Sequence, residues 1–364
     1  MKKRLLSIMT AATMTAAMIL SGCSGAQTAA TTAAAGAETT AAAGETKAAE
    51  TKAAETTKAA AGETTGKQIV VGFSQVGAES DWRTANTESM KSTFTEANGY
   101  KLIFDDAQQK QENQLKAVRN FIQQDVDYIV IAPVTETGWD TVLQEAKDAG
   151  IPVIIVDRMI DVSDDSLYTA WVGSNFLQEG YDAVAWLDDY LKKNNRADED
   201  INIVTLQGTI GSSAQIGRTD GVEEKMKDHP NWKMLERQTG EFTQAKGQEV
   251  MESFLKTYND IDVVIAENDN MAFGAIDAIK AAGKTCGPKG DITIISFDAV
   301  AAAFDAMIAG DMNVSVECNP LHGPRVAEII QKLEKGESVD KIAYVQEGVY
   351  PADTAAAEKP KRAY

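Results

Sequence analysis

Short continuous apolar runs alternate along this chain with longer stretches in which apolar residues recur at helical spacing. The first four runs, rich in Val and Ile, are predicted as strands at 69–74, 101–106, 128–133 and 152–158. Continuous runs of this length suit strands that are buried on both faces of a parallel sheet. The intervening helices are predicted at about 83–98, 112–124 and 137–149. The pattern therefore indicates repeated strand–helix–strand units.

A second series of the same kind begins after the run at 168–174, with a long predicted helix at 176–193. Its strands are predicted at 201–208, 233–238, 262–269, 292–299 and 313–318, and its helices at 214–227, 243–257, 270–282 and 300–309. The predicted fold class is α/β, with two doubly wound, Rossmann-like lobes built on parallel sheets. A last helix at 320–335 and a last strand at 343–350 fit either lobe on periodicity alone.

The first residues have a different pattern, with a basic start at Met1–Arg4 and a mostly apolar stretch from Leu5 to Leu20. This stretch is too short to span a bilayer and resembles the core of a signal peptide. It ends in Leu-Ser-Gly-Cys, an arrangement similar to a bacterial lipobox. We therefore predict a signal peptide at 1–22 and lipidation of Cys23. The alternative is an ordinary signal peptide with an incidental cysteine.

Residues 24–66 contain no aromatic residue and no Val, Ile or Leu. Such a segment cannot bury enough apolar surface to offset the entropy of an ordered chain. With Cys23 it is predicted to form a flexible tether over 23–67. The two cysteines beyond it, Cys286 and Cys318, are predicted to be unpaired thiols, because a domain of this size does not need a disulfide.

Composition narrows the classes of function. The formal net charge of −19 argues against a nucleic-acid partner, because phosphate binding needs clustered Lys and Arg. Neither His229 nor His322 lies beside a nucleophile motif, and the sequence contains no GxSxG, CxxC, HExxH or P-loop pattern. We therefore expect no enzymatic activity, no metal and no cofactor.

Polar and aromatic side chains collect where the predicted strands end, which is the edge of an α/β sheet that binds ligands. They are Trp82, Arg83, Asp157, Arg158, Arg218, Phe242, Asn268, Asp298 and Glu317. Carboxylates, amides and guanidinium groups can hold sugar hydroxyls, and aromatic rings can pack on sugar C–H faces. Taken singly, each residue could equally be a helix cap, a local ion pair or part of the core. Together they favour a free sugar as the ligand.

Several longer stretches carry a resemblance to a known family. They are GFSQVGAESDWR, QQKQENQLKAVRNF, IAPVTETGWD, LQGTIGSSAQIGR, GEFTQAKGQEVMESF and the SVECNP turn. From about Ile69 to Tyr350 the chain resembles periplasmic binding proteins of type I, the sugar-binding components of ABC transporters. Within that family it is most similar to the galactofuranose binders. The resemblance implies three crossings between the lobes, near 173, 318 and 340.

The resemblance also implies residue roles and lobe boundaries. Trp82 and Phe242 would sandwich the sugar ring, and Glu79 with Ser80 would read a furanose side chain. The hydroxyls would be bound by Arg83, Asp157, Arg158, Arg218, Asn268, Asp298 and Glu317, with Asn175 as a further candidate. The ribose-type pattern has Gln where Glu317 stands, which argues against ribose. The implied lobes are 68–173 with 319–339, and 174–318 with 340–354, followed by a polar tail at 355–364.

The function implied by the resemblance is capture of a monosaccharide between two closing lobes and its delivery to an ABC transporter permease. The protein would be a monomer, extracytoplasmic and anchored to the outer face of the cell membrane through Cys23. One alternative is a sensor of the same fold that feeds a chemotaxis or kinase receptor. Others are a binder of ribose, galactose or another pentose or hexose, a transcriptional regulator with the same core, and a sugar hydrolase using Asp157 and Asp298.

Overall fold

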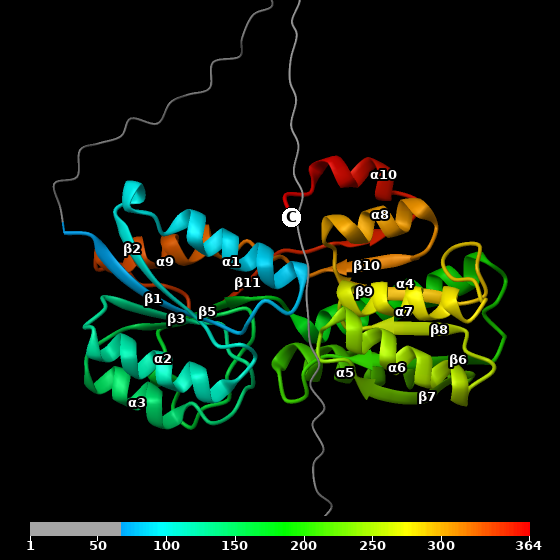
Figure 1. The fold of residues 1–364 in the computed structure, drawn as a ribbon, viewed down its shortest axis with the longest axis horizontal. Coiled ribbons are helices and arrows are strands. Elements are labelled where there is room, and N and C mark those ends of the chain that lie inside the picture. The colour runs from blue at the N-terminus through cyan, green and yellow to red at the C-terminus, as the bar shows by residue number, and fades with distance from the viewer. Residues whose placement is uncertain (1–66) are drawn as a thin grey trace, which may run out of the picture. The chain divides into compact units, whose positions relative to one another are not determined.

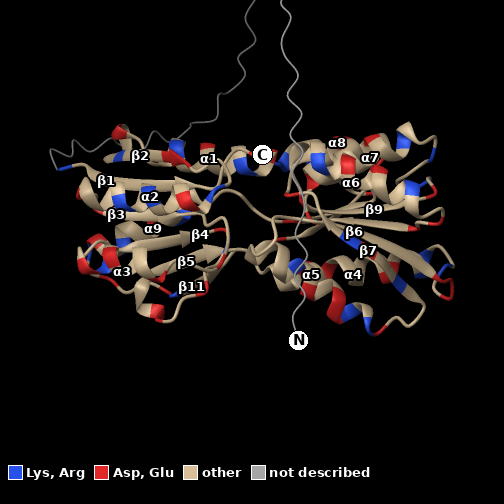
Figure 2. Ribbon diagram, turned by 60° about the horizontal axis from the view of Figure 1, so that its bottom comes forward, with Lys and Arg blue, Asp and Glu red and all other residues tan. Residues whose placement is uncertain are grey.

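The computed structural model describes residues 67–364. The predicted signal peptide and Cys23 lie outside this range, as does the predicted tether except for Lys67. In the part that the structure describes, no helix combines the length and the apolar character needed to cross a bilayer. Figure 2 shows Asp and Glu positions interspersed with Lys and Arg positions along the helices of both lobes.

The first lobe is a six-stranded sheet in the order β11-β5-β4-β3-β1-β2, with all neighbouring strands parallel. Its strands are β1 (Ile69–Gln75), β2 (Tyr100–Asp106), β3 (Tyr128–Ile131), β4 (Val153–Val156), β5 (Ala170–Gly173) and β11 (Ile342–Tyr344). Its helices are α1 (Asp81–Thr93), α2 (Gln111–Gln123), α3 (Asp140–Asp148) and α9 (Gly323–Glu334). The helix predicted at 83–98 is thus shorter, and a separate turn of 3-10 helix, η1 (Glu96–Asn98), follows it.

Both faces of this sheet are covered, which explains why its strands read as continuous apolar runs. Met90 of α1 and Ile330 of α9 pack with Val71 on one face. Phe121 of α2 and Leu143 of α3 pack on the other face. Figure 1 shows α1 and α9 on one side of the sheet and α2 and α3 on the other.

The second lobe repeats this plan with the order β12-β10-β9-β8-β6-β7. Its strands are β6 (Ile201–Gln207), β7 (Trp232–Thr239), β8 (Val263–Ala266), β9 (Thr293–Asp298), β10 (Val314–Glu317) and β12 (Val349–Pro351). Its helices are α4 (Phe176–Lys193), α5 (Ser213–Met226), α6 (Gln244–Thr257), α7 (Asp269–Ala281), α8 (Ala301–Ala309) and α10 (Ala355–Glu358). Strands β10 and β12 are antiparallel, and the other neighbours are parallel. The predicted α/β fold with two doubly wound lobes is confirmed.

The third crossing between the lobes differs from the prediction. The apolar run at 343–350 was expected to be one strand, entered from a crossing near 340. Instead Ile342–Tyr344 continue the first sheet beside β5, and Val349–Pro351 pair with β10 in the second sheet. The chain therefore crosses between residues 344 and 349. Periodicity could not reveal this, because both halves of the run are extended and only their partners differ.

The segment at 355–364, predicted as a polar tail, packs against the second lobe. Ala355 is fully buried, and the backbone N–H of Ala301 donates to the carbonyl of Tyr364 at 2.8 Å. The guanidinium of Arg362 lies 2.8 Å from Glu317 Oε1 and near the rings of Tyr350 and Tyr364. The end of the chain therefore stabilises the strands that adjoin the crossing segments.

Candidate functional site

A cavity of about 280 Å³ lies between the two lobes, at the carboxyl ends of their strands. The first lobe lines it with Glu79, Ser80, Trp82, Arg83, Asp157 and Arg158, and the second with Phe176, Ala214, Arg218, Phe242, Asn268 and Asp298. Cys318, on a crossing segment, completes the lining. Ten of the twelve predicted site residues are thus brought together, and their side chains are buried.

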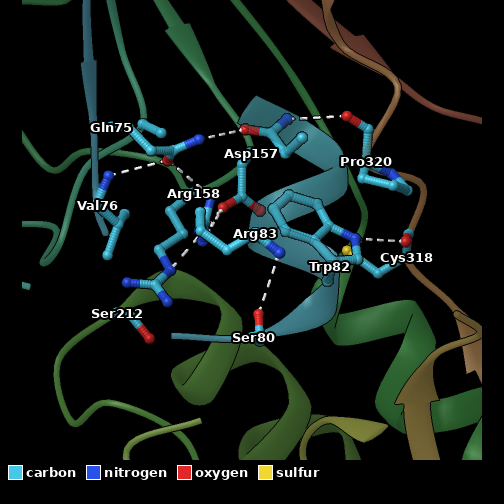
Figure 3. Close-up of polar contacts among 12 residues, drawn as sticks. Gln75, Val76, Ser80, Trp82, Arg83, Asp157, Arg158, Ser212, Cys318 and Pro320 are labelled. Carbon is cyan, nitrogen blue, oxygen red and sulfur yellow. Dashed lines mark hydrogen bonds and ion pairs between the residues drawn. The ribbon is translucent and has the colours of Figure 1, made fainter. Parts of the chain in front are cut away.

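The first-lobe wall is built around the Arg83 guanidinium. Helix α1 begins at Asp81 because the Ser80 hydroxyl accepts a hydrogen bond from the Arg83 backbone N–H at 3.1 Å, which caps the helix. The Arg83 side chain then reaches Glu79 Oε1 through Nε at 3.0 Å and Asp157 Oδ2 through Nη2 at 2.8 Å. Nη1 donates to Gln75 Oε1 at 3.2 Å. These contacts hold the guanidinium in one orientation (Figure 3).

Arg158 is bound less completely than Arg83. Its Nη1 donates to the carbonyl of Val134 at 3.0 Å, and its Nη2 lies 3.8 Å from Glu79 Oε1. Burial, together with repulsion from the Arg83 charge, lowers the pKa of Arg158 to about 10. Arg158 Nε and Glu79 Oε2 are buried and have no hydrogen-bond partner among the described residues. Buried polar atoms are normally satisfied, so this pair is suited to contact a ligand hydroxyl.

Two aromatic rings reach the cavity from opposite lobes. The indole N–H of Trp82 donates to the carbonyl of Cys318 at 2.6 Å, which fixes the plane of the ring (Figure 3). Phe242 has a positive φ of 62°. Its ring lies over Gly208, and a Cβ added to Gly208 would lie 1.9 Å from Cζ of the Phe242 ring. Cζ of Arg158 lies 5.0 Å from the centroid of the Phe242 ring. The Phe242 ring can therefore occupy this position only because Gly208 has no side chain.

The second-lobe wall is built around Arg218. Its Nε donates to Glu179 Oε2 at 2.6 Å, its Nη1 donates to the carbonyl of Glu267, and its Nη2 lies 3.4 Å from Asp298 Oδ1. Burial alone would lower the pKa of Arg218, but the charges of its acidic neighbours, Glu179 first, and the hydrogen bond to Glu179 together outweigh burial and raise it. Asn268 caps helix α7 by accepting from the Met271 N–H at 2.9 Å. Arg218 therefore remains charged inside the closed site.

Carboxyl groups are in excess on this second wall. Burial raises the pKa of Asp298 well above its usual range, and Arg218 offsets this only in part. Behind Asp298, burial raises the pKa of Asp269 to about 6, although Val300 N–H and the hydroxyls of Ser296 and Ser315 donate to it. Burial also raises the pKa of Glu267 to about 7.

The two lobes touch directly at the rim of the cavity. The backbone N–H of Asp81 donates to Asn270 Oδ1 at 3.0 Å, and that of Met159 donates to Ser213 Oγ at 2.8 Å. The N–H of Glu136 donates to the carbonyl of Gly211 at 3.0 Å. Each bond joins the first lobe to the second, so the structure represents a closed arrangement in which the cavity is shielded from solvent.

Two predicted site residues, Asn175 and Glu317, do not line this cavity. Asn175 is exposed and caps helix α4 by accepting from the Gln178 N–H at 3.1 Å. The Glu317 carboxylate accepts instead from the Gly348 N–H at 3.0 Å, the Tyr364 hydroxyl at 2.7 Å and Arg362. These donors lower the pKa of Glu317 despite its burial, which alone would raise it. Its position at a strand end was correctly predicted, but its role was not.

Sequence reasoning missed Phe176, Ala214, Glu179 and Glu267, which line or support the site. A signal existed for Glu179, because it lies three residues after Phe176 and four before Ala183, on the apolar stripe of a predicted helix. A carboxylate on such a stripe is seldom buried unless it has a partner. Here the partner is Arg218, 39 residues further along the chain.

The chain belongs to the periplasmic binding protein family. Its residues 71–338 match the family model described as a periplasmic binding protein domain. Among curated proteins, it is 46% identical over 298 residues to the galactofuranose-binding protein YtfQ of Escherichia coli, covering 81% of this chain and 91% of that protein.

Two solved structures are similar over most of the chain. One, from Mycobacterium smegmatis in complex with β-D-fucofuranose, has a TM-score of 0.77 and 45% identity, covering 81% of this chain and 95% of that one. The other is the periplasmic binding protein component of the arabinose ABC transporter from Shewanella sp. ANA-3, bound to α and β-L-arabinofuranose. It has a TM-score of 0.76 and 47% identity, with the same coverage. These similarities establish a periplasmic binding protein of type I fold.

Proposed function

We propose that this protein is the extracytoplasmic binding component of a sugar ABC importer, and that it captures one monosaccharide in its furanose form. The observation that carries the proposal is the cavity between the lobes, in which three guanidinium groups, several carboxyls and three aromatic rings converge from both lobes. A sugar hydroxyl both donates and accepts, so it can satisfy the unpartnered Glu79 Oε2 and Arg158 Nε. We expect the sugar to be bound and then released without any chemical change.

The lining of the cavity suits a single sugar ring, because carboxyl, amide and guanidinium groups surround it together with aromatic rings. Trp82 and Phe242 reach it from opposite lobes and would pack on the two faces of the ring. Charge-assisted hydrogen bonds contribute about 1.5–3 kcal/mol each, so a net binding free energy near −8 kcal/mol, roughly micromolar affinity, is readily reached. We expect that affinity or a tighter one.

The furanose preference rests on the relatives and on one loop. The relatives described above are named for, or bound to, galactofuranose, fucofuranose and arabinofuranose. In this chain Glu79 and Ser80 precede helix α1 and line the cavity, with Glu79 Oε2 unpartnered. We assign to these two residues the recognition of the exocyclic part of a hexofuranose.

The ring-size assignment is tested with the two anhydro-galactitols that lock a five-membered or a six-membered ring. Thermal shift and calorimetry on purified protein should show binding of the five-membered ring and at least about tenfold weaker binding of the six-membered one. Ribose and glucose complete the panel. A larger thermal shift with ribose or with the six-membered ring would overturn the assignment. Mass spectrometry of sugar released from protein purified without added ligand would identify the natural occupant.

Anchoring and delivery complete the proposal. The lipobox-like sequence supports lipidation at Cys23, and the membership of the family supports a permease partner that docks on the closed monomer. Replacing Cys23 by Ser should move the protein from the membrane fraction to the soluble fraction of expressing cells, with sugar binding unchanged. Retention of Cys23→Ser in the membrane fraction would reject the anchor while leaving the sugar assignment intact.

A further inference from the structure

A second cavity, of about 730 Å³, lies where the crossing segments meet the second lobe. Its lining includes the carboxyl groups of Glu179, Asp182, Glu317 and Glu347 and, in the part of the chain that the structure describes, neither Lys nor Arg. It is distinct from the sugar cavity but adjoins it, because Glu179 holds Arg218 and the neighbouring Cys318 lines the sugar cavity. The chemistry of this lining favours a cation.

Three potential ligands converge beside this cavity. A carboxylate oxygen of Glu179, Sγ of Cys318 and a carboxylate oxygen of Glu347 all lie within 4.8 Å of one another. They come from the first turn of α4, from the segment after β10 and from the segment between β11 and β12. Ser174 contacts two of them, with its Oγ 2.6 Å from Glu347 Oε1 and 3.2 Å from Cys318 Sγ. The three groups are therefore positioned by the fold.

One oxygen in this cluster lacks a partner. Glu179 Oε2 accepts from Arg218 Nε at 2.6 Å, whereas Glu179 Oε1 is buried and has no hydrogen-bond partner among the described residues. The side chain of Glu179 is 4% exposed. Arg218 balances the charge of Glu179 through Oε2, but a buried oxygen without a partner is unfavourable, so Oε1 is suited to contact a bound cation.

We propose that Glu179, Cys318 and Glu347 form a binding site for a divalent metal ion of the zinc class. Zn²⁺ takes thiolate and carboxylate ligands together, whereas Ca²⁺ and Mg²⁺ prefer oxygen ligands alone. Three protein ligands leave a fourth position of a tetrahedral ion open to the adjoining cavity. The site goes beyond sugar capture and does not depend on which sugar is bound.

The site should also couple metal binding to proton release. Metal ligands bind in their deprotonated forms, so a thiol and carboxyl groups that coordinate the ion should release protons when it binds.

The site has a consequence for lobe motion. Cys318 and Glu347 lie on two of the three crossing segments, and Ser174 on the third contacts both. A bound ion would join these segments to helix α4 and restrict the hinge. Because Glu179 also holds Arg218 in the sugar cavity, metal and sugar affinities should change each other by the same factor.

The first test is metal titration of the purified, metal-stripped full chain. Co²⁺ should bind saturably at about one equivalent and produce the near-ultraviolet thiolate-to-cobalt band, which Zn²⁺ then displaces. Calorimetry with Zn²⁺ in buffers of different ionisation enthalpy should report the proton release. The band should vanish in Cys318→Ser and persist in the matched thiol controls Cys286→Ser and Cys23→Ser.

A second variant keeps the test decisive if Cys318→Ser fails to fold. Glu347→Gln preserves an acceptor for Ser174 and Asn319, and it should weaken Zn²⁺ binding at least about tenfold without loss of sugar binding. His229 Nδ1 lies 3.9 Å from Asp188, so His229→Ala is the control for incidental surface binding. The proposal is overturned if wild type does not bind Zn²⁺ saturably, if His229→Ala alone removes binding, or if neither Cys318→Ser nor Glu347→Gln weakens it.

Discussion

The two walls of the sugar cavity balance their buried charges in different ways. In the first lobe two guanidinium groups, Arg83 and Arg158, face two carboxylates, Glu79 and Asp157. In the second lobe Arg218 faces or supports a larger group of carboxyls, namely Glu179, Glu267, Asp269 and Asp298. The first wall is balanced by ion pairs, whereas the second wall has more carboxyl groups than cations.

This difference predicts which of the two lobes binds protons near neutral pH. Burial raises the pKa values of Glu267 and Asp269 to about 7 and about 6, so these groups bind protons in a range where ordinary carboxyls are charged. In the first wall, by contrast, the nearby carboxylates raise the pKa of Arg83 despite its burial. We expect the first lobe to act as a rigid platform, and the second lobe to respond to pH.

The largest expected effect is that of removing the lone cation of the second wall. Arg218→Ala leaves Glu179 and Asp298 buried without a counter-charge, so the free energy of unfolding should fall by about 3–5 kcal/mol and sugar binding should be lost. Chemical denaturation and calorimetry measure the two effects. The matched control is Arg119→Ala, whose ion pair with Glu145 is exposed and should change stability by less than about 1 kcal/mol. Equal losses in both variants would contradict the comparison.

The next effect concerns pH. Since the pKa of Glu267 is raised from 4.5 to about 7, the native protein binds this proton more tightly than the unfolded chain does. Its contribution to stability is therefore full below pH 4.5 and is lost as the pH rises to about 7. Glu267→Gln should remove this loss, a difference on the order of 3 kcal/mol between the two ends of the range. Unfolding measured from pH 4 to pH 8 should give a flatter curve for the variant, and parallel curves would argue against a proton at Glu267.

A smaller effect is expected in the first wall. Arg158→Ala leaves Glu79 and Asp157 in contact with Arg83, so the protein should remain folded. Sugar affinity should fall at least about tenfold, which corresponds to about 1.4 kcal/mol, because the variant loses the ligand donors of Arg158. Calorimetry with the preferred sugar gives the affinity, and thermal unfolding checks the fold. An unchanged affinity would remove Arg158 from the site.

The smallest effect is expected at the rim. Asn270→Ala removes the acceptor for the Asp81 N–H, a bond that joins the two lobes. We expect sugar affinity to weaken by about 0.5–1.5 kcal/mol. Asn98→Ala is the control, because the Asn98 side chain donates within the first lobe to the carbonyl of Thr93. If both variants bind sugar as wild type does, this contact does not help to hold the lobes closed.

Local patterns were sufficient for most of the architecture. The helix predicted at about 176–193 is observed at Phe176–Lys193, because its apolar stripe is a local signal. Eight of the nine residues predicted from strand ends line the cavity, and Glu79 and Ser80, which the family resemblance implied, join them. Features that depend on distant partners were not predictable in this way.

Glu317 illustrates the limit. Its position at the end of a strand was predicted correctly. Its hydrogen-bond donors Arg362 and Tyr364, however, lie 45 and 47 residues further along the chain, and they hold its carboxylate away from the cavity. The division of the run at 343–350 between two sheets and the buried Glu179–Arg218 pair have the same origin. In each case a long-range contact, invisible to a periodic pattern, decides the outcome.

The backbone at three site residues bears on how this binding protein could evolve. Asp157, Phe242 and Asp298 have φ values of 63°, 62° and 107°, in a region that side chains other than those of Gly, Asn and Asp rarely adopt. Few other residue types would preserve the backbone conformation there, so few substitutions should be tolerated at these positions during evolution. New sugar preferences should therefore arise at Glu79, Ser80 and Ala214, whose backbones carry no such restriction.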